Sequence, residues 1–190
     1  MYWHRVNQKR PGHRYNGLSL VFVTFVSMAT SSKIILDHQE LATLTKEWQK
    51  QGLKVVFTNG CFDLIHLGHI LYLREAAAQG DKLVVALNAD ASVSKLKGNH
   101  RPINGETTRL EVMAAFEFTD AVTIFHEDTP YELISQLKPN VLVKGGDWEV
   151  DQIVGSDVVL EAGGTVKSLT FAPGYSTTLL EQKIIKAHQS

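Results

Sequence analysis

The feature that most constrains this chain is the stretch from Val55 to His69, VVFTNGCFDLIHLGH. It begins with Val55 to Phe57, whose β-branched and aromatic side chains are typical of a short buried strand. A polar turn containing glycine follows, and from Leu64 onward the chain runs into an apolar pattern of helical period. The stretch therefore predicts a strand, a loop and the start of a helix, an arrangement that binds phosphates at the edge of open parallel sheets.

Two histidines, His66 and His69, lie at the start of this predicted helix. Residues three apart share one helix face with Cβ atoms about 5 to 6 Å apart, so both rings can donate to one phosphate as negative charge develops on it. Gly60 lets a phosphate or a base approach the backbone, because glycine has no Cβ. Taken alone, a His-x-x-His pair more often marks an ordinary helix start with one partly buried ring. The residues around the pair therefore decide whether it marks a phosphate site.

Composition limits the class of protein. The chain has 190 residues, of which 44% are hydrophobic and 21% charged, as expected for one soluble globular domain. Its 19 basic and 20 acidic residues nearly balance, which disfavours a broad surface for nucleic acid. The single cysteine, Cys61, excludes an internal disulfide and fits a reducing compartment. We interpret Cys61 as a structural loop residue rather than a nucleophile.

Residues 1–30 are predicted to be an N-terminal extension and residues 31–190 the folded domain. The extension contains basic but no acidic residues ahead of an apolar run, Leu18 to Val26, and so imitates a secretory signal. That run is too short for a transmembrane helix, which needs about 20 residues. Met28 offers an alternative start of translation, with residues 1–27 then an upstream extension of the reading frame. We expect a cytoplasmic protein without stable membrane insertion; an exported protein is the alternative.

The rest of the chain alternates predicted strands and helices. Short apolar runs bounded by turn residues predict strands at 55–57, 83–87, 121–125, 141–143 and 165–169. Amphipathic spacing, with cap and turn residues at the ends, predicts helices at 37–52, 70–80, 107–116, 131–137, 154–162 and 179–187. This alternation predicts an α/β class, a Rossmann-like three-layer fold with a five-stranded, mostly parallel sheet and helices on both faces.

The loops after these strands carry polar or charged residues. Asn88 and Asp90 follow the second strand, and Asp90 also fits a helix cap. Residues 94–102 are basic and contain glycine and proline, which by composition alone favours a solvated loop. Residues 174–178 combine a glycine with three hydroxyls, which suit both a helix cap and an anion site. Neither Gly-x-Gly-x-x-Gly nor Gly-x4-Gly-Lys occurs, so a dinucleotide fingerprint and a Walker loop are excluded.

Four blocks of the sequence carry a resemblance to a known family. TNGCFDLIHLGH resembles the His-x-Gly-His signature of the cytidylyltransferase-like nucleotidyltransferases. Asn88 to Ile103, Asp128 to Trp148 and Gly174 to Thr178 resemble, in the same order, blocks of the adenylyltransferase half of the bifunctional ADP-heptose synthases. The resemblance extends over about residues 34–187, and four ordered blocks are far more specific than the signature alone.

The resemblance implies roles for particular residues. In that family the histidines act on the α-phosphate and nearby lysines hold the departing pyrophosphate, which implies catalytic roles for His66, His69, Lys95 and Lys97. The nucleotide-binding residues expected from the same blocks are Thr58, Asn59, Gly60, Phe62, Asp63, Gly68, Asn88, Arg101, Arg109, Lys144, Gly145, Gly146, Asp147, Ser176, Thr177 and Thr178. Arg109 equally fits a surface salt bridge. We expect Mg²⁺ to be bound mainly through the phosphates, with no dedicated metal site in the protein.

The resemblance also implies a reaction. We expect transfer of AMP from ATP to D-glycero-β-D-manno-heptose 1-phosphate by direct in-line attack, giving ADP-heptose for a lipopolysaccharide core or another heptose glycan, and pyrophosphate. The sugar-kinase half of the bifunctional enzymes is absent, so a separate kinase is expected, and a homodimer is expected by analogy. The alternatives are a cytidylyltransferase acting on glycerol 3-phosphate or another polyol phosphate, and a nucleotide-sensing module without turnover.

Overall fold

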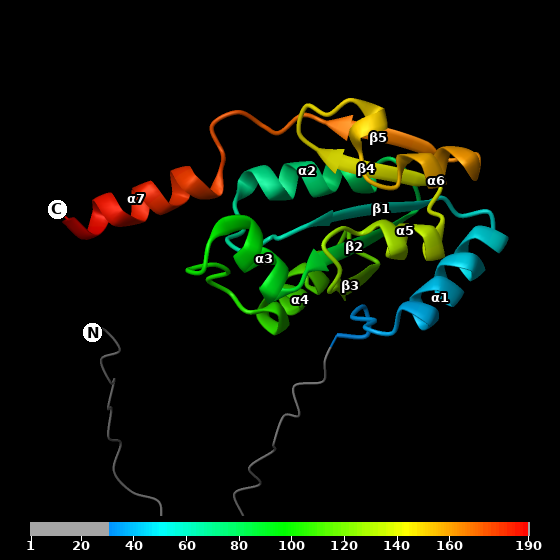
Figure 1. Cartoon of the computed structure of the whole chain (residues 1–190), viewed down its shortest axis with the longest axis horizontal. Helices are drawn as coiled ribbons and strands as arrows, with labels where there is room; N and C mark the ends of the chain where they lie inside the picture. The colour runs from blue at the N-terminus through cyan, green and yellow to red at the C-terminus, as the bar shows by residue number, and fades with distance from the viewer. Residues whose placement is uncertain (1–30, 190) are drawn as a thin grey trace, which may run out of the picture.

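The computed structural model describes residues 31–189, and the predicted N-terminal extension lies outside them. Strands and helices alternate along the described chain as expected (Figure 1). In order, the elements are α1 (His38–Lys50), β1 (Val55–Gly60), α2 (Leu67–Ala77), β2 (Lys82–Asn88), α3 (Asp90–Lys97), α4 (Glu106–Ala114), β3 (Ala121–Phe125), α5 (Tyr131–Leu137), β4 (Val141–Gly145), a 3-10 turn η1 (Val150–Gln152), α6 (Ser156–Glu161), β5 (Thr165–Leu169) and α7 (Thr177–Gln189).

The five strands form one sheet in the order β3-β2-β1-β4-β5. Every neighbouring pair is parallel, so the sheet is fully rather than mostly parallel. The chain moves outward from β1 through β2 to β3, and then returns to β4 on the other side of β1. The strand order therefore reverses between β1 and β4, and in open parallel sheets a ligand crevice forms at this point, at the carboxyl ends of the strands.

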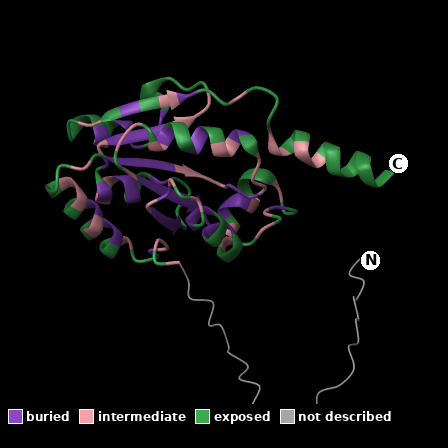
Figure 2. Ribbon diagram, turned by 180° about the vertical axis from the view of Figure 1, so that it is seen from behind, coloured by how far each residue is buried: buried purple, intermediate pink, exposed green. Residues whose placement is uncertain are grey.

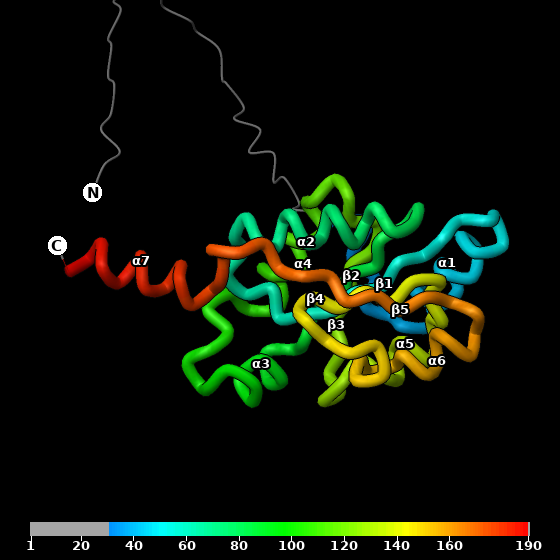
Figure 3. Tube along the Cα trace, turned by 90° about the horizontal axis from the view of Figure 1, so that it is seen from above, coloured from blue at the N-terminus to red at the C-terminus, as the bar shows by residue number. Residues whose placement is uncertain are grey.

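Helices cover both faces of the sheet, which confirms the predicted three-layer architecture (Figure 3). On one face Leu73 of α2 and Met113 of α4 are fully buried against the strands. On the other face α1, α5 and α6 contribute Leu41, Leu133 and Val159. Figure 2 shows the buried residues concentrated in the strands and the inner sides of these helices. The strands are continuous apolar runs because both of their faces are buried.

Local signals set the ends of α1 as predicted. The Asp37 carboxylate accepts hydrogen bonds from the backbone N–H groups of Gln39 and Glu40, at 2.7 and 3.3 Å. Such a cap satisfies N–H groups that have no partner within the helix. After the last turn Gly52 takes a φ of +82°, a left-handed conformation that glycine adopts without a Cβ clash.

The predicted basic loop at 94–102 is wrong over its first four residues, because α3 continues to Lys97 and the loop begins at Gly98. Helix α3 is stabilised by contacts with α4. Asp90 Oδ2 accepts the N–H of Glu106 at 3.2 Å, and the Glu106 carboxylate accepts the N–H of Asp90 at 3.2 Å. The first turns of α3 and α4 thus cap each other, and Asp90 caps α4 instead of its own helix.

The last helix, α7, projects from the body of the domain (Figure 1). None of its residues is buried, but its first residues are tied to the strand-end loops. Glu181 forms an ion pair with Arg101 at 3.0 Å, and Tyr175, just ahead of the helix, lies against Gly68. No helix within residues 31–189 has both the length and the apolar character needed to cross a membrane.

Candidate active site

A crevice opens at the carboxyl ends of β1 and β4, where the strand order reverses. It consists of a large half of about 310 Å³ and a small half of about 190 Å³. The two halves share Asn59, Gly60, Cys61 and Lys144. The large half is completed by Asn88, Leu96, Asp128, Thr129, Pro130, Trp148, Gln152, Ile153 and Val154. The small half is completed by Phe62, His69, Tyr72, Lys97, Gly145 and Phe171.

The histidine pair lies at the start of α2, as predicted. His66 is the N-cap residue and His69 belongs to the first turn. Their rings stack with centroids 3.9 Å apart and planes inclined by 21°. The Nδ1 atoms of both rings are buried and have no hydrogen-bond partner among the described residues. Buried polar atoms of this kind are rare in folded proteins and are typical of functional sites.

Both imidazoles are neutral at physiological pH. Burial lowers the pKa of His69 to about 4, with smaller contributions from the charges of His66 and Lys97. The pKa of His66 is also lowered, first by burial and then by Lys97. A neutral imidazole retains one N–H donor. The pair can therefore donate hydrogen bonds to a phosphate at neutral pH without carrying charge.

The low pKa of His69 makes the stability of the fold depend on pH. The unfolded chain binds a proton at this histidine near pH 6.5, whereas the folded chain binds it near pH 4. Stability is therefore lost as the pH falls from 6.5 to 4, by about 3 kcal/mol. Urea unfolding of wild type and His69→Asn at pH 7 and pH 4.5 measures this effect. We expect a smaller loss in the variant; equal losses in both proteins would show that His69 does not have a low pKa.

The structure separates the predicted cations. Lys97 lines the small half together with His69, and Lys144 lies on the boundary between the halves. Burial lowers the pKa of Lys144. Lys95 lines neither half, and its ammonium instead pairs with Asp128 at 2.9 Å. Lys97 and Lys144, but not Lys95, therefore line the small half together with His69, whereas His66 lines neither half.

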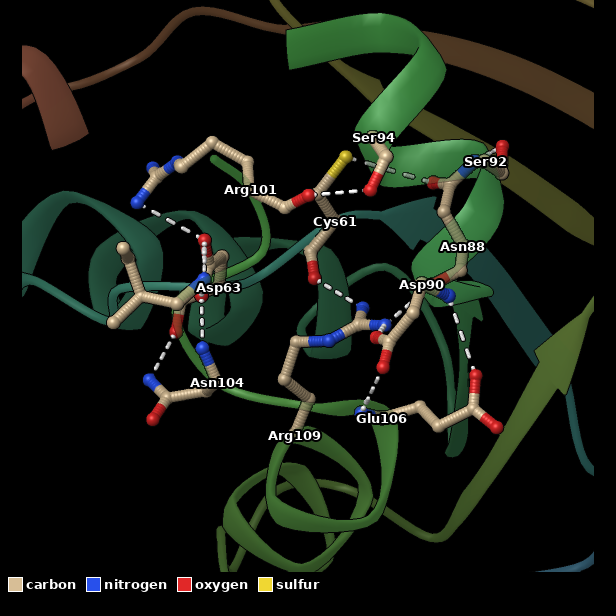
Figure 4. A network of polar contacts seen from close by, with 11 residues as sticks. Cys61, Asp63, Asn88, Asp90, Ser92, Ser94, Arg101, Asn104, Glu106 and Arg109 are labelled. Atoms are coloured by element: carbon tan, nitrogen blue, oxygen red, sulfur yellow. Dashed lines mark hydrogen bonds and ion pairs between the residues drawn. The ribbon is translucent and has the colours of Figure 1, made fainter. Parts of the chain in front are cut away.

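Asp63 and Arg101 connect loops and do not line the crevice (Figure 4). Arg101 is buried and forms an ion pair with Asp63 at 3.0 Å, in addition to its pair with Glu181. The Asp63 carboxylate also accepts hydrogen bonds from the backbone N–H groups of Ile103 and Asn104, both at 2.8 Å. These contacts hold the loop after α3 against the loop after β1, and nucleotide binding by Asp63 and Arg101 stays a prediction.

Arg109 connects the chain at the carboxyl ends of β1 and β2 (Figure 4). Only 1% of its surface is exposed, so the alternative of a surface salt bridge is wrong. Its guanidinium donates to the carbonyl oxygens of Cys61 and Asn88, at 2.7 and 2.8 Å. It also donates to Asp90 at 2.7 Å. These contacts hold the loops around the crevice, and a contact of Arg109 with phosphate stays a prediction.

Two of the predicted glycines are required by geometry. A Cβ on Gly68 would lie 2.8 Å from the Cβ of Tyr175 and 3.0 Å from Nδ1 of His66. Gly68 therefore lets the chain leading into α7 lie directly on the start of α2. Gly146 has a φ of +116°, in the left-handed region, and a Cβ there would meet the indole of Trp148 at 2.8 Å.

The remaining predicted residues lie at various depths around the crevice. Ser176 caps α7 by accepting the N–H of Leu179 at 3.1 Å, and Thr177 and Thr178 follow in the first turn. None of these three residues lines either half of the crevice. Thr58 is fully buried below it, and Asp147 accepts a hydrogen bond from the Thr170 hydroxyl at 3.2 Å. Asn59, Gly60, Phe62, Asn88 and Gly145 line the crevice as expected.

Several lining residues were missed. Tyr72 lines the small half, and its hydroxyl forms a hydrogen bond of 2.6 Å with the Thr58 hydroxyl. Burial raises the pKa of Tyr72 to about 12. It lies three residues after His69 on the same helix, so helical spacing was a usable signal. Phe171 lies against Tyr72 with ring centroids 5.5 Å apart. It follows β5, and no local pattern of the sequence singles it out.

Comparison with known proteins agrees with this geometry. The model of the family described as Cytidylyltransferase-like matches residues 57–183, which include the crevice and the histidine pair. The chain belongs to the cytidylyltransferase-like family. The chain is therefore a nucleotidyltransferase.

Curated relatives of this nucleotidyltransferase are longer proteins. The chain is 49% identical over 157 residues to the bifunctional protein HldE of Rhodopseudomonas palustris strain HaA2, covering 83% of the chain and 32% of that protein. It is 52% identical over 149 residues to the bifunctional protein HldE of Marinomonas sp. strain MWYL1, covering 78% and 31%. The chain thus spans about a third of the length of these relatives.

Solved structures share the fold of this nucleotidyltransferase. A lipopolysaccharide core biosynthesis protein from Thermoplasma volcanium GSS1 is 28% identical, with a TM-score of 0.51, and the match covers 64% of this chain and 98% of that one. Pantoate-beta-alanine ligase from Francisella tularensis, in complex with an ATP compound and beta-alanine, is 14% identical with a TM-score of 0.54. That match covers 83% of this chain and 79% of the ligase. At this identity it shows a shared fold only.

Proposed function

We propose that this nucleotidyltransferase transfers AMP from ATP to D-glycero-β-D-manno-heptose 1-phosphate, giving ADP-heptose and pyrophosphate. The observation that carries the proposal is the stacked, neutral pair His66 and His69, of which His69 lines the small half together with Lys97 and Lys144 where the strand order reverses. Hydrogen-bond donors and cations gathered in one partly enclosed site suit a phosphate that gains charge during reaction. The similarity to bifunctional HldE proteins supports the choice of ATP and a heptose phosphate.

In the proposed mechanism, a phosphate oxygen of the sugar attacks the α-phosphorus of ATP as the bond to the pyrophosphate breaks. His66 and His69 donate hydrogen bonds to the α-phosphate, and Lys97 and Lys144 stabilise the charge of the reacting phosphates. The N-terminus of α2 contributes backbone N–H groups at the same place. No residue forms a covalent intermediate, so the acceleration comes from positioning and from charge stabilisation.

We propose that Mg²⁺ enters with ATP, bound to the phosphates. Residues 31–189 contain no group of three or more histidine, cysteine or acidic side chains that could hold a metal ion. Asp63, in the loop that contains the histidine signature, already accepts two backbone N–H groups and pairs with Arg101. Mg²⁺ commonly keeps most of its ligands from water and substrate phosphates, so this donor set fits a metal carried by the nucleotide.

Pyrophosphate release tests the proposal directly. The purified protein is supplied with ATP, CTP, GTP or UTP, each paired with heptose 1-phosphate, glycerol 3-phosphate or other sugar phosphates. We expect turnover with ATP and heptose 1-phosphate at least about a hundredfold above the other pairs, because a site built to bind particular polar groups rejects analogues strongly. Turnover with CTP and glycerol 3-phosphate would replace this assignment by a polyol-phosphate cytidylyltransferase. If no pair releases pyrophosphate, the result would favour a nucleotide-sensing module.

A further inference from the structure

Tyr72 is a buried polar residue that the proposed mechanism does not use. It lies one turn after His69 in α2, lines the small half of the crevice and is only 4% exposed. Its hydroxyl lies 2.6 Å from the Thr58 hydroxyl of β1 and 3.5 Å from the carbonyl oxygen of Val143 in β4. A single side chain of α2 therefore contacts both strands between which the strand order reverses.

These contacts lie where β1 and β4 separate. The pairing of β1 with β4 ends at Thr58 and Val143. In contrast, β1 stays paired with β2 up to Gly60, and β4 stays paired with β5 up to Gly145. The crevice thus begins just beyond the last pair of β1 and β4, and the Tyr72 hydroxyl contacts both members of that pair.

The aromatic ring of Tyr72 is packed as closely as its hydroxyl is bonded. Phe171 lies against it, with the ring planes inclined by 57°. A Cβ on Gly145 would lie 3.1 Å from Cε2 of Tyr72 and would also meet the ring of Phe171. Because glycine has no Cβ, the backbone next to Lys144 can pack directly on both rings. Tyr72 is therefore held in one place by its ring as well as by its hydroxyl.

Tyr72 connects two groups that the proposed mechanism requires. His69 and Lys144 both line the small half but belong to different elements, α2 and β4. His69 is three residues ahead of Tyr72, so the two share one face of α2. Groups that act on a transition state have to be held within about 0.5 Å of their productive position by the residues behind them. The contacts of Tyr72 are the kind that fixes α2 against the end of β4.

We propose that Tyr72 is a positioning residue for nucleotidyl transfer, whose hydroxyl, bonded to Thr58 and Val143, fixes His69 relative to Lys144 across the small half. The hydroxyl acts through these contacts and does not itself meet the reacting phosphates. This inference rests on the proposed function, since it assumes that His69 and Lys144 act on the phosphates.

The test compares kcat and KM in Tyr72→Phe and Tyr131→Phe. Tyr72→Phe removes the hydroxyl and keeps the packed ring. Tyr131 is the matched control, because its hydroxyl bonds to Asp157 at 3.0 Å and the residue lines neither half. We expect kcat for pyrophosphate release to fall about tenfold or more in Tyr72→Phe, because a small displacement of reacting groups lowers the rate strongly. KM for ATP and for the sugar phosphate should stay within about threefold.

The division between kcat and KM distinguishes positioning from binding. Tyr131→Phe should keep both wild-type constants. A Tyr72→Phe protein with wild-type kcat would overturn the inference, whether or not its KM is raised. A raised KM alone would instead make Tyr72 a binding contact.

Thr58 tests the same contact from its other end, and decides the question if Tyr72→Phe does not fold. Thr58→Ser keeps a hydroxyl opposite Tyr72 and should keep kcat within about threefold of wild type, whereas Thr58→Val should lower kcat as much as Tyr72→Phe. The double variant Thr58→Val with Tyr72→Phe should be no slower than either single variant, because both remove one contact. Losses that multiply in the double variant, or equal kcat in Thr58→Ser and Thr58→Val, would contradict the inference.

Urea unfolding of the same variants separates positioning from support of the fold. Replacing both partners of a buried hydrogen bond by apolar groups can restore stability. We expect the double variant to be at least as stable as the single variants and still slow. If kcat recovers together with stability, Tyr72 only supports the fold and the inference is wrong.

Wild-type turnover separates failure of this inference from failure of the proposed function. If wild type releases pyrophosphate from ATP with heptose 1-phosphate and Tyr72→Phe keeps its kcat, only the inference fails. If wild type turns over a different pair of substrates, the proposed reaction is wrong, and the same comparison of kcat with that pair decides the role of Tyr72. If wild type turns over no pair, both are overturned, because there is no nucleotidyl transfer for Tyr72 to serve.

Discussion

Replacing His66 and His69 together by alanine is expected to lower kcat by about 10³- to 10⁴-fold. Loss of one preorganised donor to developing charge typically lowers kcat by about 10²- to 10³-fold, and donors that act as a unit are not additive. The stacked rings, 3.9 Å apart, with both Nδ1 atoms buried and without a partner, form such a unit. Pyrophosphate release at saturating ATP and sugar phosphate measures the effect.

The fold is expected to survive this double substitution. His66 is the N-cap of α2 but makes no capping hydrogen bond through its side chain, so alanine removes no cap. His126→Ala is the matched control, because this exposed histidine at the end of β3 lines neither half of the crevice. It should retain wild-type kcat. A double variant that folds normally and keeps kcat within about tenfold of wild type would remove the histidines from catalysis.

Replacing Arg109 by methionine is expected to destabilise the fold by about 3 to 5 kcal/mol, the range for breaking a buried, charged network from one side. The guanidinium is 1% exposed and serves three acceptors, two of them carbonyl oxygens at the ends of β1 and β2. Methionine fills much of the volume but donates to none of them. Urea unfolding measures the change, and Tm should fall by roughly 10 °C for a domain of this size.

Two comparisons make the Arg109 prediction specific. Arg109→Lys should recover little of the loss, since one compact ammonium cannot replace a planar fork that reaches three separate acceptors. Arg74→Met is the matched control, because Arg74 is exposed and lies 5.9 Å over the ring of Phe118. Its contribution should stay below about 1 kcal/mol. An Arg109→Met protein as stable as Arg74→Met would show that the buried contacts do not support the fold.

Strands and helix ends could be predicted from the sequence, because they depend on residues that are close together along the chain. The five strands were predicted within a few residues because strands buried on both faces are continuous apolar runs. The cap at Asp37 and the end of α1 at Gly52 follow from side-chain and backbone chemistry within a few positions. Of the residues predicted for the site, His69, Gly60 and Lys97 line the crevice together with Lys144 and Gly145 after β4, since parallel strands bring their carboxyl ends to one edge.

The sequence by itself thus determined the fold class and the family to which the chain belongs. Only the tertiary structure decided which charged residues face the crevice. Arg109 meets the carbonyl oxygen of Cys61 across 48 positions, and Lys95 meets Asp128 across 33. Such pairings depend on how packed helices place side chains in space. Basic residues of neighbouring helices therefore have different surroundings: Lys97 lines the crevice, whereas Arg109 is bonded to other parts of the chain.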